Sequence, residues 1–311
     1  MFAESYVSYS LLILLNFMSV RCLLLPLLFF SCAIMAQVRP GQLLENEVLQ
    51  SRVLGKSVDY AVYLPPDYHS SQRSYPIVYL LHGYTDNHTG WTQFGEIAYL
   101  LDDAIAAREI TPMIVVMPDA GVSWYVDNFD GSVRYEEFFT KEFLPIVEKT
   151  YRTRNDRRYR GVAGLSMGGY GSLLYALKHP DLFSAAAPLS AALYTEADVL
   201  RQPQDRWEKI ESVVYGPNLE GEARLTPHWR ANNIFEIIEG KTKEELSAVR
   251  YWFDIGDEDF LYRGNSELHI LLRDKGIPHE FRVRDGGHTW TYWRTGIIPA
   301  LKFITEGFHQ K

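Results

Sequence analysis

Cysteine is nearly absent from this chain of 311 residues. The sequence contains only Cys22 and Cys32, and both lie within the first 36 residues. From residue 37 onward the chain therefore has no disulfide, no thiolate metal ligand and no cysteine nucleophile. Its stability must come from a buried core, and a chain of this length can build a large one.

Basic residues are also fewer than acidic residues. The chain has 31 Lys and Arg against 39 Asp and Glu, which gives a formal net charge of −8. Because affinity for phosphates needs a basic surface, this balance argues against a nucleic-acid partner. Apolar residues make up 47% and charged residues 23%, which is typical of a globular protein. We find neither an internal repeat nor a low-complexity linker, so one domain is expected.

The N-terminal segment has the features of a secretory signal peptide. In residues 18–37 a positive charge precedes an apolar run, and the small residue Ala36 follows it. The apolar run is shorter than the roughly 20 residues that a membrane-spanning helix needs. We expect residues 1–36 to be removed, with translation starting at Met1 or at Met18.

The mature chain is then expected to be secreted or periplasmic, without stable membrane association. An uncleaved N-terminal anchor and a lipid anchor at Cys32 are the less favoured alternatives.

Apolar patterns along the rest of the chain alternate between strand and helix. A hairpin around Gly55 is predicted over 44–64. The six strands predicted after it cover 76–83, 113–120, 159–166, 183–190, 249–256 and 279–286, and the helices between and after them cover 94–109, 134–151, 167–180, 265–276 and 292–307. This order predicts an α/β fold with a mainly parallel sheet, helices on both faces and an antiparallel N-terminal hairpin.

Residues 194–248 interrupt this alternation. A structureless loop of that length would be unusual, so we expect a small, partly helical cap inserted in a single domain over 37–311.

The segment "GLSMGG" (164–169) lies where a predicted buried strand meets a helix. At such a corner a serine is held in a strained turn with its hydroxyl above the sheet, so Ser166 is the predicted nucleophile. A serine needs a base, and the chain order of this motif puts the histidine after the last strand. His288, in "RDGGHTW", has that position, whereas His179, His269 and His279 do not.

The same motif requires two backbone N–H donors for an oxyanion. The residue after the nucleophile, Met167, should supply one of them. The loop after the strand over 76–83 should supply the other, and Tyr84 is the candidate, although an ordinary strand-end turn is the alternative.

Four stretches together resemble a known family: "YLLHGYTDNHTGW" (79–91), "VVMPDAGVSWYVDN" (115–128), "VAGLSMGGYGSLLYALKHPDLFSAAAPLS" (162–190), and the pair "FDIGDEDFL" and "GGHTW". They resemble the "putative esterase" family of α/β-hydrolases, which includes feruloyl esterases, S-formylglutathione hydrolases and mycolyltransferases. The resemblance covers roughly residues 45–305. It implies an α/β-hydrolase fold, a Ser-Asp/Glu-His triad, acyl-ester chemistry and no metal or other cofactor. The predicted export signal departs from the cytosolic S-formylglutathione hydrolases.

The acid of the triad must come from the four carboxylates of "FDIGDEDFL". Asp254 lies within the predicted strand, while Asp257, Glu258 and Asp259 follow Gly256 in the loop. Chain order selects this loop but not the residue. The family pattern places the acid three residues after the glycine, which favours Asp259, with Asp257 as the alternative. A calcium loop is disfavoured, because the sequence becomes apolar after Asp259.

Aromatic residues are frequent in the predicted site loops, and Trp124 and Trp290 are the candidates for binding substrate. Together with the resemblance, they predict a serine carboxylesterase that removes feruloyl, cinnamoyl or acetyl groups. The expected substrate is a small-molecule or oligosaccharide ester, such as a fragment of a plant polysaccharide. The alternatives are an acyltransferase with the same triad, a broad short-chain esterase similar to S-formylglutathione hydrolase, and a non-enzymatic carbohydrate-binding relative. The oligomeric state is left open.

Overall fold

The structure is a computed structural model that describes residues 40–309. The predicted signal peptide, with Met18, Cys32 and Ala36, lies outside the described residues. Within the described range, no helix combines the length and the apolar character that crossing a membrane requires.

Eight strands form one sheet in the order β1-β2-β4-β3-β5-β6-β7-β8. The strands are β1 (Gln42–Gln50), β2 (Ser57–Leu64), β3 (Ile77–Leu81), β4 (Ile114–Pro118), β5 (Arg160–Leu165), β6 (Ala185–Leu189), β7 (Arg250–Gly256) and β8 (His279–Arg284). Strand β2 pairs antiparallel with β1 and with β4, and all other neighbours are parallel. The predicted parallel sheet with an antiparallel hairpin is therefore confirmed.

Each central strand contributes side chains to both faces of the sheet, because successive residues of a strand point to opposite sides. In β3, Ile77, Tyr79 and Leu81 belong to one buried cluster, and Val78 and Leu80 belong to the other. This explains why these strands are continuous apolar runs, as expected for a sheet covered on both faces.

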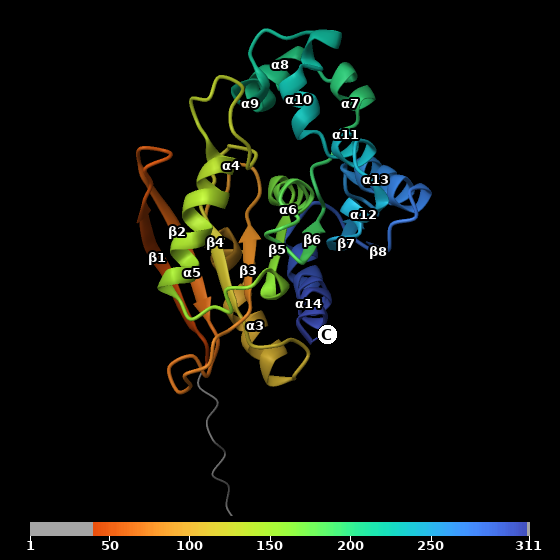
Figure 1. Cartoon of the computed structure of the whole chain (residues 1–311). Coiled ribbons are helices and arrows are strands. Elements are labelled where there is room, and N and C mark those ends of the chain that lie inside the picture. Colours follow the sequence, from red (N-terminus) through yellow and green to blue (C-terminus); the bar gives the residue numbers. More distant parts are fainter. Residues whose placement is uncertain (1–39, 310–311) are drawn as a thin grey trace, which may run out of the picture. The chain divides into compact units, whose positions relative to one another are not determined.

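Helices cover both faces (Figure 1). The first cluster is closed by the segment α4 (Tyr135–Phe138), π-helix (Phe139–Phe143) and α5 (Leu144–Thr150), and by α6 (Met167–Lys178) and α13 (Tyr262–Asp274). The second is closed by α2 (Gly90–Gln93), α3 (Ile97–Ala106) and α14 (Trp290–Glu306). Short 3-10 turns, Arg157–Tyr159 and Gly307–His309, complete this part of the chain.

Two predicted helices differ in detail from those observed. The helix predicted over 94–109 is interrupted before α3, because Glu96 has a left-handed backbone with φ 53°. The helix predicted over 134–151 contains a π-helical turn in its middle, which places Phe139 and Phe143 in the core next to Tyr79. Apolar periodicity does not reveal such a widened turn.

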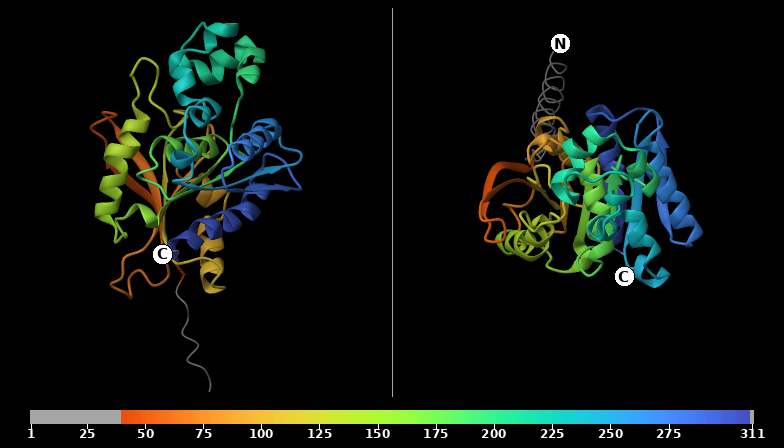
Figure 2. Two further views of the ribbon diagram at one scale, coloured as in Figure 1. Left: turned by 45° about the vertical axis from the view of Figure 1, so that its right-hand side comes forward. Right: turned by 90° about the horizontal axis from the view of Figure 1, so that it is seen from above.

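Residues 194–248, called the helical insertion below, contain α7 (Glu196–Arg201), α8 (Gln204–Arg206), a π-helix (Trp207–Glu211), α9 (Ser212–Tyr215), a 3-10 turn (Gly221–Arg224), α10 (Pro227–Asn232), α11 (Ile234–Glu239) and α12 (Lys243–Leu246). Capping boxes begin α7 at Thr195 and α12 at Thr242. Helices α7 to α10 lie beyond the carboxyl ends of the parallel strands, as Figure 1 and the left view of Figure 2 show. The insertion therefore adjoins the edge of the sheet at which α/β proteins bind their ligands.

Candidate active site

Ser166 connects β5 directly to α6 and has an unusual backbone. Its φ is 53° and its ψ is −115°, a conformation that costs a side-chain-bearing residue about 1–3 kcal/mol. The corner closes because its neighbours are glycines. A Cβ on Gly164 would lie 2.5 Å from the carbonyl oxygen of Gly168. The sequence motif therefore corresponds to a real, strained strand-to-helix turn.

His288 reaches Ser166 from the loop between β8 and α14. Its Nε2 lies 2.9 Å from the Ser166 hydroxyl oxygen. The loop turns at Gly286, where φ is 127°, and Thr289 then caps α14 with its hydroxyl. The imidazole packs between Phe260 and Trp293, at ring-centroid distances of 4.7 and 4.8 Å. The ring is thus held in place on both sides.

Asp259 lies behind His288. Its Oδ2 is 2.8 Å from the histidine Nδ1, and its Oδ1 accepts a hydrogen bond of 2.9 Å from the Leu261 N–H. The residue is only 1% exposed. Because a carboxylate only accepts, Nδ1 carries the proton and Nε2 is left to accept the proton of the Ser166 hydroxyl. The chain Asp259–His288–Ser166 therefore has the hydrogen-bonding order that activates a serine.

Asp257 and Asp254 have other environments. The Oδ1 of Asp257 accepts a hydrogen bond of 3.0 Å from the Gly286 N–H, so it joins the acid loop to the histidine loop. The Glu258 N–H reinforces this junction by donating to the Gly286 carbonyl. Asp254 is fully buried and accepts two hydrogen bonds from Arg284, at 2.5 and 3.1 Å. Burial raises the pKa of Asp254 to about 6, against the opposing effect of Arg284.

The two oxyanion candidates, Tyr84 and Met167, line the same cavity as Ser166. Within residues 40–309, the Tyr84 N–H donates no backbone hydrogen bond, and Met167 is the first residue of α6, where the N–H has no partner within the helix. Both donors are therefore free to bind a ligand.

His82, which the sequence analysis did not single out, fixes the loop that carries Tyr84. Its Nε2 accepts a hydrogen bond of 2.8 Å from the Ala120 N–H, and its Nδ1 donates to the Gly83 carbonyl at 2.8 Å. This pattern requires a neutral imidazole. These two hydrogen bonds join the loop after β3 to the loop after β4. In the sequence, the only indication of this role is that His82 directly precedes Gly83.

A cavity of about 550 Å³ opens beside Ser166. Its walls are Gly83, Tyr84, Thr85, Asp86, Phe94, Trp124, Leu165, Ser166, Met167, Ala192, Tyr194, Arg206, Ile210, Phe260, Leu261, His288, Thr289, Trp290 and Trp293. This volume suits an ester of small-molecule size. Both predicted substrate residues are among the walls, together with three residues of the helical insertion, Tyr194, Arg206 and Ile210.

Trp124 and Trp290 lie on different walls. The indole N–H of Trp124 points to the Ile210 carbonyl, 3.4 Å away, and its ring lies near Tyr84 and Tyr194. Trp290 packs edge-on against buried Trp91 and also against Phe94, whose side chain is largely exposed. The cavity therefore offers several aromatic surfaces, of the kind that stacks on flat rings.

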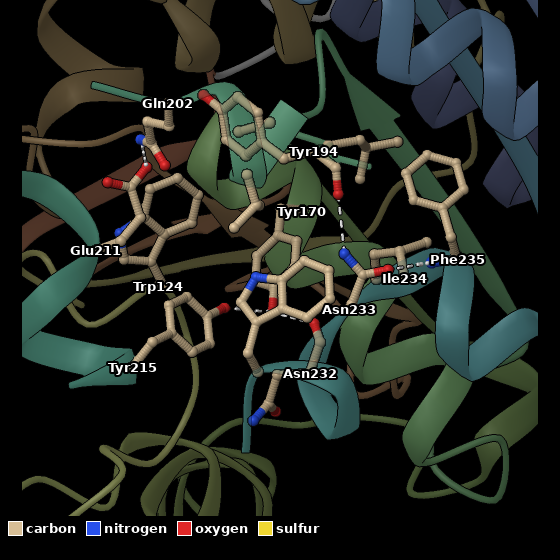
Figure 3. A pocket seen from close by; sticks show the side chains of 14 residues that line it. Trp124, Tyr170, Tyr194, Gln202, Glu211, Tyr215, Asn232, Asn233, Ile234 and Phe235 are labelled. Atoms are coloured by element: carbon tan, nitrogen blue, oxygen red, sulfur yellow. Dashed lines mark hydrogen bonds between the residues drawn. The ribbon is translucent and has the colours of Figure 1, made fainter. Parts of the chain in front are cut away.

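A second, smaller cavity of about 30 Å³ lies behind Trp124 and Tyr194 (Figure 3). Glu211, only 5% exposed, is one of its walls, and its Oε1 accepts a hydrogen bond of 2.7 Å from Gln202. Its Oε2 has no hydrogen-bond partner among the described residues. Burial raises the pKa of Glu211 to about 7. Glu211 was not predicted from the sequence, because an isolated glutamate in a polar stretch gives no signal of burial.

No group of three or more His, Cys, Asp or Glu side chains in the described part of the chain is arranged to hold a metal ion. The chemistry that these residues can perform is proton transfer from a serine hydroxyl through a histidine.

Comparison with known proteins places the chain in a family. Residues 51–304 match the family model described as "Putative esterase". An esterase of Mycobacterium tuberculosis is 32% identical over 263 residues, which is 78% of this chain and 54% of the relative. The chain thus spans about half the length of that relative. An acetyl esterase of Caldicellulosiruptor saccharolyticus is 26% identical over 230 residues, 74% of this chain and 83% of the relative.

Among solved structures, a ferulic acid esterase superimposes with a TM-score of 0.76 at 33% sequence identity. The match covers 87% of this chain and 99% of that structure. Together with the family match, which extends over most of the sequence, this shows that the chain belongs to the esterase family of α/β-hydrolases.

Proposed function

We propose that the protein is an exported serine carboxylesterase that hydrolyses feruloyl, cinnamoyl or acetyl esters on plant polysaccharide fragments. The observation that carries this proposal is the hydrogen-bonded chain from Asp259 through His288 to Ser166, with distances of 2.8 and 2.9 Å. It lies beside a cavity of a size that suits such an ester. The names of two relatives, an acetyl esterase and a ferulic acid esterase, support the choice of acyl groups.

In the proposed mechanism the Ser166 oxygen attacks the ester carbonyl while His288 Nε2 takes the hydroxyl proton. Negative charge develops on the carbonyl oxygen, and the backbone N–H groups of Tyr84 and Met167 stabilise it. The tetrahedral intermediate collapses, the imidazolium gives its proton to the leaving alcohol, and an acyl-enzyme remains. Water, deprotonated by His288, then attacks the acyl carbon. The imidazolium returns its proton to the Ser166 oxygen as the acid leaves, and Asp259 stabilises the imidazolium in both halves of the reaction.

Trp124 and Trp290 are proposed to hold the flat acyl group or a sugar ring. The helical insertion is proposed to act as a cap in a single domain over 37–311, because three of its residues line the cavity. No cofactor takes part in this mechanism. Residues 1–36 are proposed to direct export and then to be removed, which mass spectrometry of the mature protein recovered from its natural source would test.

Steady-state kinetics test the proposal. The Ser166→Ala protein should lose all turnover of 4-nitrophenyl acetate. Methyl ferulate, acetylated xylan and short-chain 4-nitrophenyl esters should then be compared in the wild-type protein. A clear preference for one of the first two substrates supports the polysaccharide assignment, whereas equally weak turnover of all three contradicts it.

A further inference from the structure

Three arginines gather in a cavity next to the candidate active site. Arg201, Arg206 and Arg263 line a space of about 250 Å³, and the one carboxylate among its walls is Asp198. The cavity is thus locally positive, although the whole chain carries a net charge of −8.

Two of these three arginines have no ion-pair partner in the range 40–309. Arg201 pairs with Asp198 at 3.0 Å, but neither Arg206 nor Arg263 forms an ion pair. The Nε of Arg206 is buried without a hydrogen-bond partner. One terminal nitrogen of Arg206 donates to the Tyr194 hydroxyl at 2.8 Å, which holds the guanidinium in place. Arg206 is therefore a positioned cation with an unused donor.

Neither Glu211 nor Asp86, the carboxyl groups near Arg206, forms an ion pair with it. Glu211 feels its charge, yet burial is the larger effect and leaves Glu211 with a pKa of about 7, so this carboxyl is partly protonated at neutral pH. Asp86 lines the cavity of Ser166 but forms no ion pair with Arg206. The other terminal nitrogen of Arg206, Nη1, makes no hydrogen bond to the described residues, and guanidinium N–H groups bind carboxylate oxygens well.

The arginine cavity adjoins the cavity of Ser166, and Arg206 is a wall of both. Tyr194, Phe260 and Leu261 are the other walls that they share. The ring of Phe260 also packs on the imidazole of His288 at 4.7 Å. A substrate bound at Ser166 can therefore extend past Phe260 and reach the guanidinium of Arg206.

We propose that this cavity is a specificity subsite, in which Arg206, with Arg263 nearby, binds a carboxylate carried by the ester substrate. The inference rests on the proposed esterase function and narrows its substrate class to acidic esters. The carboxylate can belong to the alcohol part, as on an acidic sugar, or to the acyl part. Arg206 acts in binding and takes no part in the bond-breaking step.

Two matched pairs of esters test the subsite and distinguish the two sources of the carboxylate. In the pair 4-nitrophenyl hexanoate and 4-nitrophenyl hydrogen adipate, a carboxylate replaces the terminal methyl group of the acyl part. In the pair phenyl acetate and 4-acetoxybenzoate, the leaving group gains one. Each kcat/KM is divided by the rate of alkaline hydrolysis of the same ester, which removes differences in chemical reactivity.

We expect the acidic ester of at least one pair to be preferred about tenfold, the size of a single charge-assisted hydrogen bond. Arg206→Gln should abolish the preference, and 0.5 M NaCl should reduce it in the wild-type protein, because salt screens the charge. Arg282→Gln is the matched control. It removes the same charge from an exposed arginine of β8 that pairs with Glu280, and it should keep the preference.

Failure of this inference differs from failure of the esterase proposal. If Ser166→Ala keeps its turnover, the catalytic proposal is wrong. If Ser166-dependent turnover is intact but neither acidic ester is preferred, or if Arg206→Gln retains the preference, the subsite is refuted. Titration of the Ser166→Ala protein with the four esters measures binding apart from turnover, and equal affinities within both pairs would also overturn the subsite.

Discussion

The acid of the candidate triad offers the sharpest test, because two aspartates compete for the role within three residues. Asp259 contacts the His288 Nδ1 at 2.8 Å and the Leu261 N–H at 2.9 Å with its two oxygens. An asparagine has only one oxygen for these two N–H groups. If that oxygen stays with Leu261, the amide NH₂ faces Nδ1 and the histidine must carry its proton on Nε2. In this tautomer it cannot accept the Ser166 proton.

The expected loss in kcat for Asp259→Asn is about 10⁴-fold, the effect of the same change in other triads, or about 5 kcal/mol of transition-state stabilisation. Asp257→Asn should stay within about threefold of the wild-type protein, because an asparagine oxygen can still accept the Gly286 N–H. Initial rates with 4-nitrophenyl acetate give kcat, and circular dichroism melting curves verify that both variants fold. A crippled Asp257→Asn beside a nearly normal Asp259→Asn would refute the assignment.

Three further predictions concern strain, titration and substrate stacking. Ser166→Gly should raise the free energy of unfolding by about 1 kcal/mol in urea denaturation, because glycine adopts φ 53° and ψ −115° without strain. An unchanged or lower free energy of unfolding would show that the turn is relaxed. Burial raises the pKa of Glu211 from 4.5 to about 7, so the folded state binds this proton more tightly than the unfolded state does. The contribution of Glu211 to the free energy of unfolding is therefore largest below pH 4.5. As the pH rises from about 4.5 to about 7, up to about 3 kcal/mol of stability is lost. Glu211→Gln should lack this loss, and parallel curves of unfolding free energy against pH for the two proteins would contradict the reasoning. Trp290→Ala should lower kcat/KM for methyl ferulate about tenfold more than for 4-nitrophenyl acetate, because only the aromatic acyl group gains from stacking on the indole. An equal loss on both esters would show that Trp290 contributes only to packing.

Local sequence patterns determined most of the architecture. Continuous apolar runs such as that of β3 and the 3.6-residue periodicity of α13 depend only on neighbouring residues, so the element order could be predicted without the fold. The same holds for Ser166, whose turn is defined by the glycines directly around it. His288 followed from chain order, because the fold places the loop after the last strand at the same edge of the sheet as the serine.

The tertiary structure decided what depends on residues that are distant in the sequence. Asp257 and Asp259 are two positions apart in one loop, and only the approach of the histidine loop shows that one contacts Gly286 and the other contacts His288. The arginine cavity joins Arg206 to Arg263, which lie in separate elements, and Glu211 acquires its raised pKa from burial behind Trp124. The charge around a residue, its burial and its distance from residues far away in the sequence all depend on how the chain packs. The sequence by itself therefore predicted the fold, the candidate nucleophile and, through the family spacing, Asp259 as the candidate acid, while the contacts of that acid and the candidate specificity surfaces came from the three-dimensional structure.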